Sequence, residues 1–71
     1  MPNRLVDYHI GRLADKDPAV RLKAINELRL LGDSAALEAL ERIFHADENL
    51  EVRRAAQAAG REIFLKNQPK P

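Results

Sequence analysis

The sequence predicts an all-α fold, a short α-solenoid of two helical hairpins that contains four antiparallel helices. Part of the chain repeats: Ala-Asp-Lys-Asp-Pro-Ala-Val-Arg begins at Ala14, and Ala-Asp-Glu-Asn-Leu-Glu-Val-Arg begins at Ala46, 32 residues later. Apolar residues recur at helical spacing in every segment, and residues that favour helix ends lie between the segments. A fixed period in this range is typical of stacked helical repeats, none of which can bury its apolar face alone.

The first repeat, about residues 4–32, is predicted to form two helices. The first runs over about residues 4–14, and Asn3 can cap it. Asp17 before Pro18 predicts the start of the second, because aspartate accepts free amide protons and proline has no amide proton to lose. Gly32 is placed to end this helix in a left-handed conformation. The residues expected to be buried are Val6, His9, Ile10 and Leu13, followed by Val20, Ala24, Leu28 and Leu31.

The second repeat, about residues 33–66, has the same organisation. Asp33 and Ser34 open a helix over about residues 35–46, with Ser34 expected as a cap, and Asn49 caps a helix over about residues 50–66. The residues expected to be buried are Leu37, Leu40, Ile43 and Phe44, followed by Val52, Ala56, Ala59 and Ile63. Residues 1–66 are thus predicted to form a single domain. Residues 67–71 are polar and proline-rich, which predicts a disordered tail.

Composition excludes several classes of protein. The chain has 71 residues and a net charge of +1, so it has no overall attraction to nucleic acid or to an anionic membrane. No apolar run approaches the ~20 residues of a membrane helix, and no secretory signal is visible. The absence of cysteine excludes disulfides, thiol catalysis and cysteine-bound metals. We therefore expect a cytoplasmic protein that is not attached to a membrane. Binding of a nucleic-acid backbone by its arginines is a further hypothesis, which the near-zero net charge disfavours.

The repeated motif Asp-x-[Asp/Asn]-x-x-Val-Arg-x-x-Ala is followed by an apolar stretch that ends in Leu-Gly-Asp. This pattern resembles a HEAT repeat, in particular the short HEAT-like type found in phycobilisome-lyase proteins. The resemblance covers residues 15–33 fully and residues 47–64 without the terminal Leu-Gly-Asp. It specifies the architecture and not the function, since the family includes scaffolds, adaptors and chromophore-lyase subunits.

Arg21 and Arg53 have two possible roles. They could bind an anion, or they could be structural. The resemblance implies the structural role, in which the arginines pair with the turn aspartates Asp15 and Asp47 and form a ladder that ties hairpin to hairpin.

A second set of residues forms a candidate partner-binding face. At ~100° per residue, Arg29 and Leu22 lie opposite the buried stripe of the second helix, with Ile25 beside them. Arg54 and Arg61 lie opposite the stripe of the fourth helix, next to Gln57. Stacking of the repeats is expected to place Arg21 over Arg53 and Arg29 over Arg61, and the resemblance implies that these helices line a concave surface. The face is therefore either a basic partner-binding groove or a solvated face that maintains solubility. The candidate partner-binding residues are Arg29, Arg54, Arg61, Leu22 and Gln57.

No catalytic, cofactor-binding or metal-binding pattern is visible. His9 takes a core position that leucine fills in the second repeat, and His45 is expected to be exposed. Neither is followed by glutamate, as the His-Glu pairs of di-iron HEAT-like proteins would require. The hydroxyl side chains are limited to Ser34 and Tyr8, and the chain contains no calcium loop or glycine-rich phosphate loop. We expect a protein that is not an enzyme.

These observations favour a non-catalytic protein–protein interaction or scaffold module. It would bind a protein partner through the basic concave face or through the exposed ends of the solenoid. The alternative is an accessory subunit of a chromophore lyase or a pigment–protein assembly factor. Because neither terminal helix looks like a cap, some apolar side chains should remain exposed. We therefore expect either a homodimer, with two-fold symmetry as its simplest form, or docking onto a larger solenoid.

Overall fold

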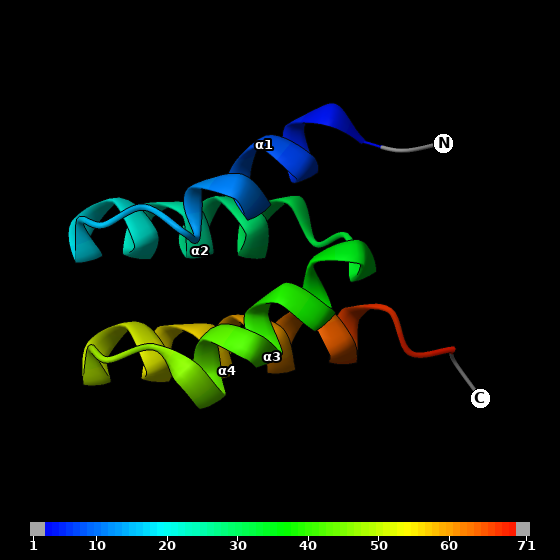
Figure 1. Ribbon diagram of the computed structural model, residues 1–71. Helices are drawn as coiled ribbons and strands as arrows, with labels where there is room; N and C mark the ends of the chain where they lie inside the picture. The colour runs from blue at the N-terminus through cyan, green and yellow to red at the C-terminus, as the bar shows by residue number, and fades with distance from the viewer. Residues whose placement is uncertain (1–2, 70–71) are drawn as a thin grey trace.

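The computed structural model describes residues 3–69 and contains four α-helices and no strand in that range (Figure 1). Helices α1 (Arg4–Arg12) and α2 (Pro18–Leu31) form the first hairpin. Helices α3 (Leu37–Ala46) and α4 (Leu50–Lys66) form the second. One 3-10 turn, η1 (Ser34–Ala36), connects the two hairpins. The predicted all-α helical repeat is confirmed.

The predicted helix ends are present. Oδ1 of Asn3 accepts the amides of the first turn of α1 at 2.9 and 3.3 Å. Oδ1 of Asp17 accepts an amide of α2 at 2.9 Å, and Oδ1 of Asn49 accepts one of α4 at 3.1 Å. Gly32 ends α2 with a φ of 66°, in the left-handed region where glycine carries no steric penalty. Each of these ends follows from a local sequence signal.

The start of the third helix differs from the prediction. Ser34 does not cap it: Oδ1 of Asp33 accepts the Ala35 amide at 2.9 Å, and Ser34 is the exposed first residue of η1. The tighter turn places Ala36 in the core with no exposed surface, and α3 begins only at Leu37. Aspartate and serine are about equally good caps, so their order in the chain did not reveal which one would act.

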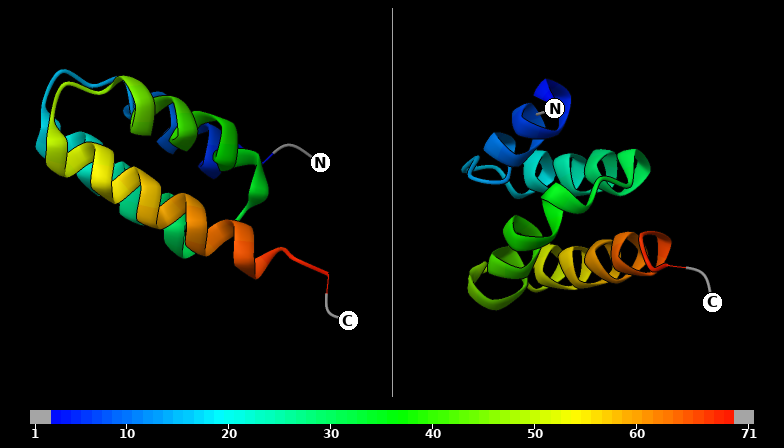
Figure 2. Two further views of the ribbon diagram at one scale, coloured as in Figure 1. Left: turned by 90° about the horizontal axis from the view of Figure 1, so that it is seen from below. Right: turned by 90° about the vertical axis from the view of Figure 1, so that its right-hand side faces the viewer.

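The four helices form two layers. Figure 2 shows α2 and α4 side by side in one layer, with α1 and α3 in the other. Small side chains on α4, including Ala55 and Ala59, share a hollow with Ile25 of α2. Between α1 and α3 the hairpins diverge around a hollow lined in part by Ile10 and Ile43. The hairpins therefore stack mainly through α2 and α4.

The core is continuous across both hairpins. Its fully buried apolar residues include Val6, Leu13, Ala24, Ile25, Leu28, Ala36, Leu40, Val52, Ala56, Ala59 and Ile63. In α4 the buried residues are the four that were predicted. Leu37, Ile43 and Phe44 of α3, expected to be buried, are only half-buried. Leu37 and Phe44 lie on the side of the second hairpin that has no neighbour, and Ile43 borders the hollow between α1 and α3.

Helix α2 is buried over a different arc from the predicted one. Ile25, placed beside the exposed face, is only 2% exposed, and Arg21 is buried as well. Val20 and Leu31, expected in the core, are half-buried. The reason is that α2 lies between two neighbours: α1 covers one flank, and the second hairpin covers the flank that carries Arg21 and Ile25. The apolar stripe in the sequence indicated only the first of these contacts.

Asn67, the first residue of the expected tail, makes defined contacts. Its side-chain amide donates to the Gly32 carbonyl at 3.0 Å and to the Ile63 carbonyl at 2.8 Å. It thereby links the C-terminal ends of α2 and α4. Lys70 and Pro71, also part of the expected tail, lie outside the described residues.

Candidate functional site

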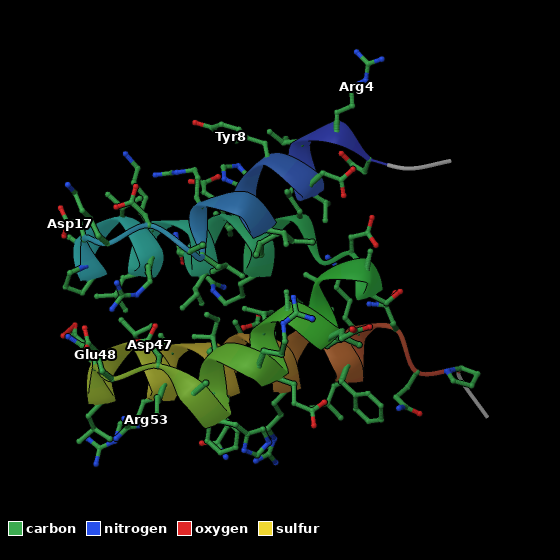
Figure 3. All side chains as sticks on the ribbon, viewed as in Figure 1. Arg4, Tyr8, Asp17, Asp47, Glu48 and Arg53 are labelled. Carbon is green, nitrogen blue, oxygen red and sulfur yellow. The ribbon has the colours of Figure 1, made fainter. Side chains whose placement is uncertain are left out.

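The interface between the hairpins contains a buried ion pair. Nη2 of Arg21 donates to Oδ1 of Asp47 at 3.0 Å, and Nε lies 2.8 Å from Oδ2. Nε makes no hydrogen bond to that oxygen, so this second contact is ionic. The two side chains are 9% and 6% exposed. Asp47 lies between the hairpins (Figure 3), and its Oδ1 also accepts the Asn49 amide at 2.9 Å. The pair therefore joins α2 to the turn before α4.

The ladder has a definite register. Within each repeat the arginine binds the aspartate backbone: Nη1 of Arg21 donates to the Asp15 carbonyl at 2.8 Å, and Nη1 of Arg53 donates to the Asp47 carbonyl at 2.7 Å. The carboxylate contact goes to the following repeat, from Arg21 to Asp47. The predicted tie between hairpins is present, but the Asp15 carboxylate does not pair with Arg21. The stacking of the hairpins decides this, because it carries the second turn next to the first arginine.

This register leaves one charged member of the ladder at each end of the molecule without an ionic partner among the described residues. Among residues 3–69, neither the Arg53 guanidinium nor the Asp15 carboxylate forms an ion pair. Both groups are nevertheless held in place as in the complete pair. Arg53 keeps its backbone bond to Asp47, and Oδ1 of Asp15 accepts the Asp17 amide at 2.8 Å. One end thus offers a cation and the other an anion.

An apolar groove of about 330 Å³ lies on the open side of the second hairpin, between α3 and α4. We call it the end groove. It is lined by Leu37, Leu40, Glu41, Phe44, Ala56, Gln57, Gly60, Arg61 and Phe64. Each position in the second hairpin has a counterpart in the first: 31 residues earlier for α3, which matches α1, and 32 residues earlier for α4, which matches α2. Their buried counterparts there are Val6, His9, Leu13, Ala24, Ile25, Leu28 and Gly32. The end groove therefore corresponds to the surface through which the first hairpin packs against the second.

The predicted partner-binding residues line two different hollows or neither of them. Leu22 and Arg29 line a shallow hollow between α2 and α4, whereas Gln57 and Arg61 line the end groove. Arg54 is exposed and is not among the residues that line either.

Arg29 contacts an acidic side chain of the second hairpin. Nη1 of Arg29 lies 3.4 Å from Oε1 of Glu62, and its Nη2 donates to Asn26 at 2.7 Å. Stacking brings Glu62 opposite Arg29, so the basic face is interrupted by an acidic side chain.

The two histidines lie where the sequence placed them. His9 is 6% exposed, with Nδ1 3.3 Å from Nη1 of Arg12, and His45 is exposed, with Nε2 3.8 Å from Oε1 of Glu41. Within the described residues, no three histidine, cysteine or acidic side chains come close enough together to hold a metal ion. None of the helices between residues 3 and 69 is both long and apolar enough to cross a membrane.

Sequence reasoning missed the end groove. Phe64, expected among the apolar side chains left exposed at the end of the solenoid, is 54% exposed, but Gly60 and the facing side of α3 were not expected to form a groove with it. The internal repeat contained the necessary signal: the counterparts of the residues that bury the first hairpin have no third hairpin to cover them.

The family model for HEAT repeats matches residues 2–60 of this chain. No curated protein and no solved structure matches it. The match includes α1, α2, α3 and most of α4, and it agrees with the stacked helical hairpins. The chain therefore belongs to the HEAT-repeat family.

Proposed function

We propose that this chain is a non-catalytic protein–protein interaction module that binds a protein partner through the end groove. HEAT repeats in general mediate protein–protein interaction. The observation that carries the proposal is the exposure of a surface whose counterpart in the first hairpin is buried by a helical hairpin. An apolar surface of this kind is stabilised when a partner removes it from water.

The composition of the end groove suits a helical partner. Leu37, Leu40 and Phe44 supply apolar surface along α3, and Phe64 adds an exposed aromatic ring from α4. Charged and polar side chains, including Glu41, lie at the same surface, so a partner would gain orientation as well as burial. Gly60 leaves space between the helices for an incoming side chain.

The basic face is the weaker candidate for partner binding. Arg29 is already engaged by Glu62 and Asn26, so a partner would have to displace or share those contacts. Arg54 and Leu22 fit a solvated face as well as a binding one. We therefore give the end of the solenoid precedence over the concave face.

The role of an accessory subunit in chromophore attachment rests on the resemblance alone. A groove of about 330 Å³ lies at the small end of the ~300–1,000 Å³ typical of ligand pockets. Protein binding is therefore the stronger proposal. Cytoplasmic location stays a prediction.

Blocking the end groove should abolish partner binding. In Gly60→Arg the new Cβ meets only Leu40, at an ordinary 3.9 Å, so a long charged side chain can enter the groove. Gly11→Arg is the matched control, since nothing lies within 4 Å of its new Cβ. Both changes should raise helix stability, because glycine is ~1 kcal/mol worse than arginine within a helix. Pull-down and mass spectrometry should recover a partner with the wild type and Gly11→Arg and lose it with Gly60→Arg. A partner retained by folded Gly60→Arg would contradict the proposal.

A further inference from the structure

We propose that the partner of the end groove is a second copy of this chain, stacked head to tail, so that Arg53 of one copy binds Asp15 of the next. This inference rests on the proposed function and specifies the partner. It follows from the fact that the two ends of the molecule carry the two halves of the interface already present between its hairpins.

The first argument is the geometry of the ladder. Arg53 is fixed by a backbone bond of 2.7 Å, as Arg21 is by one of 2.8 Å. Asp15 accepts a turn amide at 2.8 Å, as Asp47 does at 2.9 Å. Both groups are thus oriented before they meet, which lowers the entropic cost of pairing them. Figure 3 shows Asp47 between the hairpins and Arg53 on the side away from the first hairpin, where a following copy would lie.

The second argument is the apolar surface at the opposite end. Ala36 and Ala39 pack toward the first hairpin, and their counterparts in α1 are Leu5 and Tyr8. These two side chains are 50% and 61% exposed, and Tyr8 points away from the second hairpin (Figure 3). Leu30, the counterpart of Glu62, is 59% exposed. Large apolar side chains therefore occupy the positions that would face the end groove of another copy.

The sizes of the facing side chains compensate one another. Leu5 and Tyr8 are larger than the alanines they correspond to. The end groove has Gly60 where the first hairpin has the fully buried Leu28. The receiving surface thus has extra room, and the inserted surface has extra volume.

The third argument is charge. Ile10 and Ile43 line one hollow between the hairpins, and their counterparts are Glu41 and Arg12. An apolar contact within the chain would therefore become a contact between opposite charges across copies. The second hollow, between α2 and α4, adds no such pairing, because the counterparts of its lining residues include three basic side chains and one acidic one, Arg54, Arg61, Lys23 and Glu27. Together with Arg53 and Asp15, the two ends carry two complementary charge pairs, which favour this register.

The complementarity determines the symmetry. A two-fold dimer, our expectation from the sequence, would place one end against its own copy and bring Arg53 toward Arg53. Head-to-tail contact uses two different surfaces and leaves one of each kind free after every addition. The assembly should therefore grow with concentration beyond a dimer, or stop only where a ring closes.

Sedimentation equilibrium of the full chain, with two charge reversals, tests this inference. The wild-type weight-average mass should rise past that of a dimer. Asp15→Arg and Arg53→Glu should each raise the apparent dissociation constant at least tenfold, because each places like charges at the junction. An equimolar mixture of the two variants should associate again, since Arg53 of one meets Asp15 of the other and the substituted side chains also have opposite charges. Recovery in the mixture shows that both variants are folded.

Two further variants separate pairing from folding. Glu51→Lys changes the net charge by as much as Asp15→Arg does, and Glu51 and its counterpart Ala19 are both exposed, so this variant lies outside the junction and should associate like the wild type. Asp15→Asn removes the charge and keeps a side-chain oxygen that can accept the Asp17 amide. An asparagine oxygen accepts an amide in the same way at Asn49. The Asp15→Asn variant should stay as helical as the wild type and associate more weakly.

Several results would overturn the inference. One is a wild-type chain that stays monomeric at roughly 1 mM, a concentration at which even a contact with a millimolar dissociation constant populates oligomers. Another is a weight-average mass that saturates at the mass of a dimer. The third is self-association that neither charge reversal weakens. A monomeric chain whose foreign partner is lost in Gly60→Arg would refute self-stacking and leave the proposed function intact. The self-stacking inference and the proposed function are both contradicted if Gly60→Arg changes neither partner binding nor self-association.

Discussion

Arg21 and Arg53 occupy equivalent positions in their repeats and differ in what faces them. Arg21 meets the buried carboxylate of Asp47, whereas Arg53 is half-buried and keeps only its backbone contact. A buried ion pair adds little net stability, because desolvation of the charges offsets their attraction. Removal of one partner is costly, since the other charge stays buried and unpaired.

Alanine substitution should separate these two arginines. Arg21→Ala should lower the free energy of unfolding by about 3 kcal/mol, because it leaves the Asp47 carboxylate buried alone. Arg53→Ala should lower it by about 1 kcal/mol, the value of one hydrogen bond to a carbonyl. Urea unfolding at low protein concentration would measure both. Equal losses would show that the Arg21–Asp47 pair is not buried in solution.

At the scale of one element, the end of α2 depends on the backbone of Gly32. Its φ of 66° is unfavourable for other residues, and a Cβ there would lie 2.7 Å from Nζ of Lys66. The same glycine offers its carbonyl to Asn67. The end of α2 is thus coupled to the end of α4, and the turn into η1 depends on both.

Two glycine-to-alanine changes should have opposite effects. Gly32→Ala should lower the free energy of unfolding by about 1–2 kcal/mol, the cost of a left-handed conformation for an L-residue. Gly11→Ala should raise it by about 0.5–1 kcal/mol, because Gly11 is helical and nothing lies within 4 Å of a new Cβ. Thermal midpoints by circular dichroism would show the two shifts. A neutral Gly32→Ala would mean that the turn can relax.

At the scale of the whole molecule, the two hairpins share one core. Ile25 and Leu28 of the first hairpin join the same buried cluster as Val52 and Ala59 of the second. Neither hairpin encloses its own apolar residues. We therefore expect the full chain to unfold in one cooperative transition.

A peptide of residues 1–32 should be largely unfolded. Its two helices, of 9 and 14 residues, are near or below the length at which isolated helices are marginal in water, and their core would lose its cover. Far-ultraviolet circular dichroism should show little helix in the peptide and strong helix in the full chain. A peptide as helical as its share of the full chain would show that one hairpin folds alone.

The sequence by itself determined the helices and their ends. Asn3, Asp17, Asn49 and Gly32 act where they were expected, because a cap depends on groups only a few residues away. The buried stripe of α4 was also predictable, because its apolar spacing includes the residues that face both of its neighbours, α3 and α2.

Tertiary structure alone decided how the hairpins meet. The burial of Ile25, the pairing of Arg21 with Asp47 and the contact of Arg29 with Glu62 all depend on how far one hairpin is shifted and rotated on the other. That placement is set by side-chain packing between residues far apart in the chain, and helical periodicity carries no information about it. The open positions at Asp15 and Arg53, and the end groove, became visible only once this register was known.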